Sequence, residues 1–173
     1  ITPKNSSFLA VYPHDLCEDE LQSQKVAINL PSEQTAVPGG FAPNTNLSIG
    51  KGERNVDGSP SQVTFRNICQ LFKLQVPSYI DGRITKIVLA TNKAIAGKLL
   101  VDYSASVPSV AMDNQESTSV TLLPPAGSTT FAEGTYYMAL APVQAEGFSL
   151  TMTDTNGKSY SQHSKQAFGG TSG

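Results

Sequence analysis

Tryptophan is absent from this chain of 173 residues, and histidine and cysteine occur only twice each. Charged residues make up 15% of the sequence and leave a net charge of −2. Such a chain has no basic stripe to neutralise a phosphate backbone, so we expect no nucleic-acid partner. No apolar run approaches the roughly 18 residues that a spanning helix needs. We therefore expect no membrane-spanning segment within this chain.

Motifs that carry known catalytic chemistry are also absent. The sequence has no G-x-S-x-G, no H-E-x-x-H and no phosphate-binding loop. Because tryptophan is missing, no aromatic platform for a sugar stands out. We expect no enzyme, no cofactor, and no catalytic, cofactor-binding or metal-binding residue. One alternative stays open, since folding can bring two carboxylates together as in glycoside hydrolases.

The two histidines and two cysteines do not form a recognisable metal motif. The spacing of His14, Cys17, Cys69 and His163 resembles no zinc-ligand pattern. His14 follows a proline and His163 lies among polar residues, so both are expected at the surface. Two free thiols are favoured over a Cys17–Cys69 disulfide.

Short apolar runs that alternate with polar residues are the main pattern in the chain. Alternation with a period of two predicts strands. Around Ile68 the spacing changes, which predicts a strand, a helical turn or bulge, and a second strand. Residues 14–24 are polar and predict a loop. The predicted strands cover 7–13, 25–30, 46–51, 62–76, 83–90, 94–103, 119–123, 134–142, 148–153 and 158–162.

Two strand pairs look like β-hairpins. Asp154-Thr155-Asn156-Gly157 supplies the turn for 148–153 and 158–162, and Thr91-Asn92-Lys93 joins 83–90 to 94–103. The fold class predicted from these patterns is all-β, a β-sandwich of about 7–10 short strands. We expect a single domain over 1–165, followed by a Gly-rich tail or linker at 166–173.

The alternation also predicts which side chains form the core. Residues of the same strand face lie two positions apart, so each strand offers one apolar face. The side chains expected to be largely buried are Phe65, Leu71 or Phe72, Leu89, Leu99, Tyr137 and Leu150.

Five segments over about residues 8–165 follow one another in a recognisable order. They are Leu30-Pro-Ser-Glu-Gln-Thr35, Phe41-Ala-Pro-Asn-Thr-Asn-Leu-Ser-Ile-Gly50, Val63-Thr-Phe-Arg-Asn-Ile-Cys69, Ile84-Thr-Lys-Ile-Val-Leu89 with Ala94-Ile-Ala-Gly97, and Tyr136-Tyr-Met-Ala-Leu-Ala-Pro142. Together they resemble the fimbrillin-like family, the subunits of type V pili in Bacteroidetes. The order and spacing of the segments carry the resemblance, since no single segment is specific.

The resemblance implies a transthyretin-like or Greek-key sandwich and the N-terminal domain of a two-domain subunit. It implies an exported lipoprotein at the bacterial cell surface, outer membrane or fimbrium. The function it implies is that of a pilus stalk, anchor or tip that assembles by β-strand exchange and supports adhesion. The implied partners are other pilus subunits, in a homopolymer or a heteropolymer. The sequence does not identify the strand that is exchanged, nor what precedes residue 1 or follows residue 173.

A surface binding module is the alternative function. Loops on a rigid sandwich are common binding sites. In this hypothesis an adhesin recognises a glycan or a host surface protein through loops 31–45, 50–61 and 104–117.

Overall fold

The computed structural model describes residues 7–21, 24–53, 57, 59, 62–105 and 107–169. Over these residues the chain is all-β, with fourteen strands, two short 3-10 turns and no α-helix. The elements are β1 (Ser7–Tyr12), η1 (His14–Leu16), β2 (Cys17–Leu21), β3 (Lys25–Leu30), β4 (Glu33–Thr35), β5 (Ser48–Glu53), β6 (Thr64–Asn67), β7 (Gln70–Val76), η2 (Ser78–Ile80), β8 (Ile84–Thr91), β9 (Ala96–Asp102), β10 (Ser109–Ser117), β11 (Ser119–Leu123), β12 (Gly134–Leu140), β13 (Phe148–Asp154) and β14 (Ser159–Ser164).

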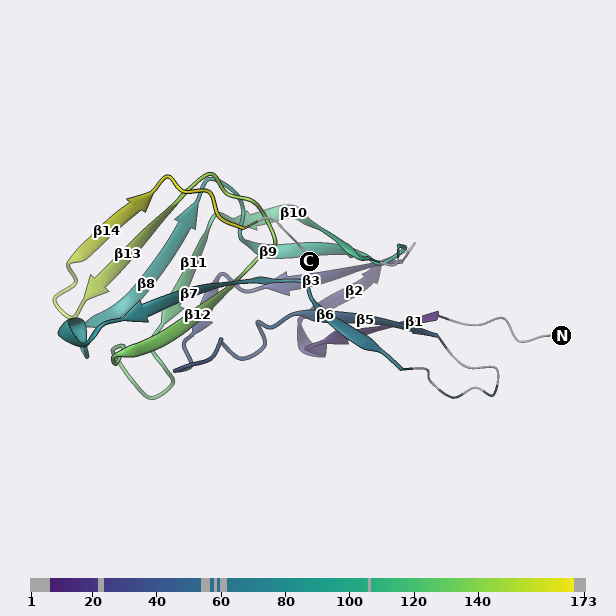
Figure 1. The fold of residues 1–173 in the computed structure, drawn as a ribbon, viewed down its shortest axis with the longest axis horizontal. Coiled ribbons are helices and arrows are strands. Elements are labelled where there is room, and N and C mark those ends of the chain that lie inside the picture. The colour runs from purple at the N-terminus through teal and green to yellow at the C-terminus, as the bar shows by residue number, and fades with distance from the viewer. Residues whose placement is uncertain are drawn as a thin grey trace.

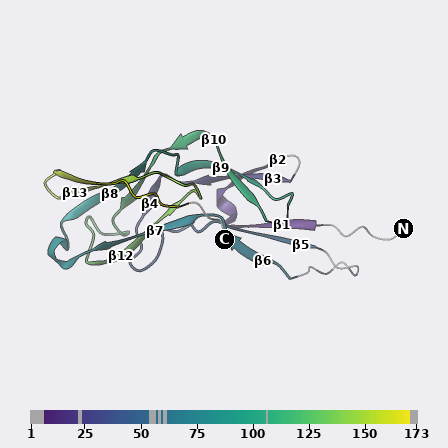
Figure 2. The same ribbon diagram turned by 45° about the horizontal axis from the view of Figure 1, so that its top comes forward.

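The strands form four sheets arranged as two layers. Their orders are β1-β5-β6, β12-β7, β10-β9-β3-β2 and β14-β13-β8-β11-β4. Short connections carry the chain from one sheet to the next: β6 leads to β7 through Ile68 and Cys69, and β10 leads to β11 through Thr118. Figure 2 shows β5, β6, β7 and β12 on one side and β8, β9, β10 and β13 on the other. The fold is therefore an elongated β-sandwich.

The larger of two hydrophobic cores lies between the five-stranded sheet and the β12-β7 pair. Tyr136 is fully buried, its ring packs edge-on against Phe131 with centroids 5.2 Å apart, and its hydroxyl donates to the Ala132 carbonyl at 2.9 Å. Full burial of such a side chain contributes about 1.5–3 kcal/mol. We call this set the large core: Ala36, Leu74, Val76, Ile84, Ile87, Leu89, Ile95, Ala96, Val120, Leu122, Phe131, Tyr136, Met138 and Leu140.

A second core lies between the β10-β9-β3-β2 sheet and the β1-β5-β6 sheet. Alternate residues of β3 and β9 supply five of its eleven buried residues, which matches the period-two pattern in the sequence. Leu9 and Val11 of β1 pack at its margin. We call this set the small core: Val26, Ile28, Leu30, Leu47, Ile49, Ile68, Leu99, Val101, Tyr103, Ala139 and Ala141.

Phe168 belongs to the segment 166–173 that the sequence predicts as a tail or linker. Its ring lies edge-on to Phe72 and Phe148, at centroid distances of 6.0 and 5.4 Å. Its backbone N–H donates to the Ala145 carbonyl at 3.1 Å, and its carbonyl accepts from the Ala145 N–H at 3.0 Å. The chain up to Phe168 thus packs against the large core, while residues 170–173 lie outside the described residues.

One predicted hairpin is confirmed and the other is wrong. β13 and β14 pair antiparallel around the predicted turn. β8 and β9 do not pair with each other, because β8 lies between β13 and β11 whereas β9 lies between β3 and β10 in a different sheet. The break at Ile68 and Cys69 is confirmed as the link between β6 and β7. The predicted loop 14–24 instead holds η1 and β2.

The predicted core is partly correct. Leu89 and Leu99 are fully buried. Phe65 and Leu71 are 49% and 44% exposed, because they lie on the outer face of the sandwich, whereas Phe72 packs against the large core. Two further predicted core residues, Tyr137 and Leu150, are only partly buried, and in β12 it is the neighbouring Tyr136 that faces inward. Along the described residues, no helix is long and apolar enough to cross a membrane.

Candidate functional site

β1 forms one edge of the molecule. It pairs with β5 over six residues, from Ser7 opposite Glu53 to Tyr12 opposite Ser48, and borders no second strand among the described residues (Figure 1). An edge strand presents a row of backbone N–H and C=O groups to which another strand can pair. Strand addition at this edge is therefore open to a further chain.

The two faces of β1 have different partners. Leu9 and Val11 point inward and pack against the small core, next to fully buried Ile49 of β5. Because side chains alternate along a strand, Phe8, Ala10 and Tyr12 share the opposite, outward face. β1 therefore covers one side of the small core with only two apolar side chains.

The outward face of the β1-β5-β6 sheet has glycines on its central strand β5 and apolar side chains on both neighbouring strands. Gly50 and Gly52 of β5 lie opposite Ala10 and Phe8, and Phe65 of β6 lies opposite Gly50. A Cβ on Gly52 would meet the Phe8 ring at 2.5 Å, so glycine lets that ring lie across β5. Tyr12 is 59% exposed, and Phe65 also stays about half exposed. The outward face of this sheet therefore carries these two exposed aromatic side chains.

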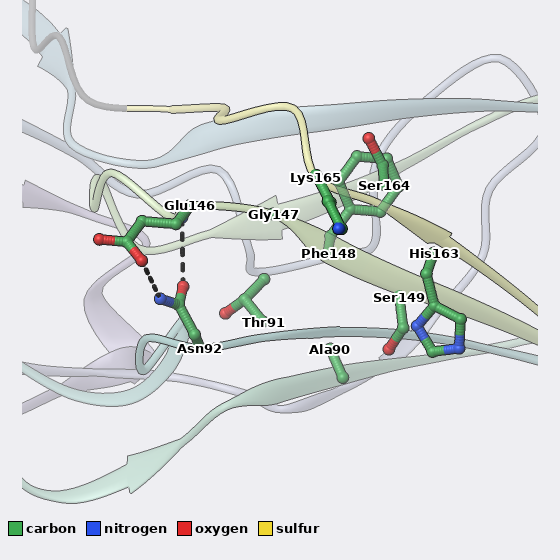
Figure 3. A pocket seen from close by; sticks show the side chains of 10 residues that line it. All are labelled: Ala90, Thr91, Asn92, Glu146, Gly147, Phe148, Ser149, His163, Ser164 and Lys165. Atoms are coloured by element: carbon green, nitrogen blue, oxygen red, sulfur yellow. Dashed lines mark hydrogen bonds between the residues drawn. The ribbon is translucent and has the colours of Figure 1, made fainter.

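A shallow hollow of about 420 Å³ lies at the other layer, between the end of β8 and the β13-β14 pair. His163 and Ser149 lie opposite one another in the pairing of these two strands. Figure 3 shows them at one end of the hollow and Glu146 at the other. Glu146 is bound to Asn92, whose side chain donates to the carboxylate at 3.4 Å and accepts from the Glu146 N–H at 3.2 Å.

The hollow does not assemble a nucleophile with its base and an orienting acid. The carboxylate among its lining residues is that of Glu146, which lies away from His163 (Figure 3). A catalytic serine needs a histidine that is itself held by a third group. Ser149 and His163 therefore form an ordinary cross-strand pair of β13 and β14.

The two histidines and the two cysteines lie in different environments. His14 in η1 and His163 in β14 are exposed, as predicted. Cys17 and Cys69 are half-buried against the small core and are not joined by a disulfide. Burial raises the pKa of the Cys69 thiol to about 12, which keeps it protonated and unreactive. The described residues contain no group of three or more His, Cys, Asp or Glu side chains that could hold a metal ion.

Each of the three predicted binding loops contains part of a strand or a whole one. Most of 104–117 is strand β10, so the prediction of a loop there is wrong. Segment 31–45 contains β4, and Phe41 bridges Tyr137 of β12. In 50–61, β5 continues to Glu53, and residues 54–56, 58, 60 and 61 lie outside the described residues.

No family model, no curated protein and no solved structure matches this chain. The resemblance to the fimbrillin-like family therefore stays a prediction that rests on the five sequence segments. What the chain itself provides is an all-β sandwich with an N-terminal edge strand.

Proposed function

We propose that this chain is a structural subunit of a bacterial cell-surface pilus, as a stalk, anchor or tip, that assembles by β-strand exchange and supports adhesion. The position of β1 is the observation that carries this proposal. β1 is an edge strand of six residues that pairs along its length with β5, and its Leu9 and Val11 cover the small core.

The states before and after exchange of β1 differ little in free energy, because the same contacts are made in both. A strand from a neighbouring subunit with the same alternation would pair with the same backbone groups of β5 and fill the positions of Leu9 and Val11. While β1 is part of the chain, its high effective concentration favours the intramolecular pairing. Cleavage or displacement of β1 removes that advantage, and the intermolecular strand then competes on equal terms.

One exposed aromatic side chain of the same sheet suits a subunit in a fibre. Phe65 of β6 lies on the outward face opposite Gly50, so it stays in place when a neighbour's strand replaces β1. Burying about half of such a side chain contributes on the order of 1 kcal/mol. Phe65 would stabilise the contact that strand exchange begins.

The resemblance supports the cellular setting of this function. It implies an exported lipoprotein located at the outer membrane or in the fimbrium, with other pilus subunits as partners in a homopolymer or heteropolymer. We also propose that the chain has no catalytic role.

Peptide complementation tests strand exchange. A variant that begins at Pro13 lacks β1 and should bind a fluorescent peptide of residues Ser7–Tyr12, measured by anisotropy. A peptide with Leu9→Asp and Val11→Asp should not bind, since it would place two charges against the small core. A peptide with Ala10→Ser changes the outward face and should bind like the native one. Equal binding of all three peptides, or of none, would falsify exchange at this edge.

A further inference from the structure

A second pocket lies at the end of the molecule opposite β1. It has a volume of about 610 Å³ and lies between η2 with the start of β8 and the β13-β14 turn. Figure 1 shows the β7–β8 connection and the β13–β14 turn together at this end. The Thr155 N–H donates to the Arg83 carbonyl at 3.0 Å, which holds the two segments together. Pockets of this size bind small ligands.

Two tyrosines far apart in the sequence line this pocket. Tyr79 of η2 is 77% exposed and Tyr160 of β14 is 51% exposed. The ammonium of Lys158 lies over one face of the Tyr160 ring, 5.0 Å from its centroid. Apolar groups of buried Ile84 and half-buried Met152 complete the lining. The structure thus places two tyrosine side chains in one pocket, in a chain that has no tryptophan.

A fixed carboxylate lies beside these rings. One oxygen of Asp154 accepts the backbone N–H groups of Asn156 at 2.8 Å and Lys158 at 3.0 Å, and the other accepts the Tyr160 hydroxyl at 3.3 Å. The bond from the Lys158 N–H, with those from Asn156 and Tyr160, lowers the pKa of the Asp154 carboxyl. Asp154 is therefore an ionised acceptor whose position is set by the turn.

The pocket carries charge of both signs. Arg83 supplies a cation and Asp154 an anion among the lining residues, and Asn156 adds an amide. The Asp154 carboxylate would repel an anionic ligand, and the Arg83 guanidinium would repel a cationic one. A neutral ligand rich in hydroxyl groups can donate to one and accept from the other.

We propose that this pocket binds a pyranose unit of a neutral carbohydrate. A pyranose has an apolar C–H face that packs on an aromatic ring and an edge of hydroxyl groups that both donate and accept. Tyr79 and Tyr160 receive the face, while Asp154 and Arg83 receive the hydroxyls. Only one carboxylate, that of Asp154, lies among the lining residues, so the pair needed for glycoside hydrolysis is not formed here.

Carbohydrate binding at this pocket does not depend on strand exchange, because the pocket and β1 lie at opposite ends of the molecule (Figure 1). The test uses the whole chain on an array of immobilised neutral and anionic glycans. A soluble form of the strongest neutral ligand is then titrated by calorimetry. We expect binding to neutral glycans with a dissociation constant of about 1 mM or below.

Four variants separate stacking from folding. Tyr79→Ala and Tyr160→Ala should each weaken binding at least about tenfold. Tyr79→Phe should keep the affinity within about threefold, because the ring remains. Val107→Ala trims an exposed apolar side chain between β9 and β10, outside the pocket lining, and should change nothing. Binding to no neutral glycan, a preference for anionic glycans, or a Tyr79→Ala affinity equal to that of Val107→Ala overturns the proposal.

Discussion

The side-chain amide of Gln34 pairs with the backbone of Ala139 as a neighbouring strand would. Its nitrogen donates to the Ala139 carbonyl at 2.8 Å, and its oxygen accepts from the Ala139 N–H at 3.0 Å. Gln34 lies in β4, at the edge of the five-stranded sheet, and Ala139 lies in β12 of the opposite layer. One buried glutamine therefore links the two layers and satisfies both backbone groups of a buried residue.

Replacing Gln34 should cost a large part of the stability of the fold. Gln34→Leu leaves the buried N–H and C=O of Ala139 without partners, each at about 1–3 kcal/mol. We expect the free energy of unfolding to fall by about 2–4 kcal/mol, measured by urea denaturation. Gln75→Leu, an exposed glutamine on β7, is the control and should change stability by less than about 0.5 kcal/mol. Equal effects of the two substitutions would show that the amide bridge contributes nothing.

Gly52 should be required for the docking of β1. In Gly52→Ala the new methyl group overlaps the Phe8 ring, so the ring must move off β5. Hydrogen exchange of the β1 amides should become faster than in the native chain, while the amides of β13 stay unchanged. Adding Phe8→Ala removes this overlap, leaves the close approach of the new methyl group to Val63 at 2.9 Å, and should restore part of the protection. If the double variant exchanges faster than Gly52→Ala alone, the contact between these two residues does not hold β1.

Asp154 should stabilise its turn in a pH-dependent way. Its pKa is lowered in the folded state by the backbone N–H of Lys158 first, with help from Asn156 and Tyr160. The stabilisation is therefore complete above the unfolded pKa of about 3.9 and is lost as pH falls through the lower folded value. NMR titration of the Asn156 and Lys158 amides should report this midpoint below the usual aspartate range. Asp154→Asn should abolish the transition, and a midpoint at or above the usual range contradicts the bonding described.

Cys69 should not react in the folded state. Burial raises the pKa of its thiol to about 12, so very little thiolate is present at neutral pH. We expect iodoacetamide to modify Cys69 only after denaturation in urea, with mass spectrometry of the tryptic peptides as the measurement. Rapid modification of Cys69 in the native chain would mean that the small core is open at this point.

Local patterns predicted the parts of the fold that local chemistry determines. The turn Asp154–Gly157 fixes its own conformation, with the Asp154 carboxylate bonded to Asn156 and Lys158, so the β13–β14 hairpin could be read from the sequence. β8 and β9 alternate equally well, yet the alternation does not say which sheet each one joins. That choice depends on contacts with β11, β13 and β3, which are distant in the chain.

Local patterns also do not determine which of two neighbouring residues faces the interior. Tyr136 and Tyr137 are equally apolar, and only the packing of β12 on β8 and β11 selects Tyr136 for the interior. β10 was predicted as a loop because residues 104–117 are mostly small and polar, yet Val110 and Met112 of this edge strand pack against the small core. The tyrosine pocket joins η2 to β14, and no sequence window contains both.

The most direct test of strand exchange shortens the connection that lets β1 fold back onto its own β5. Deleting His14–Leu16 removes η1 and should force β1 to pair with β5 of another copy. Light scattering of the purified variant should then give multiples of the subunit mass, and excess peptide of residues Ser7–Tyr12 should return it to a single subunit. A variant that stays at one subunit mass, or oligomers that the peptide leaves unchanged, would contradict assembly through β1.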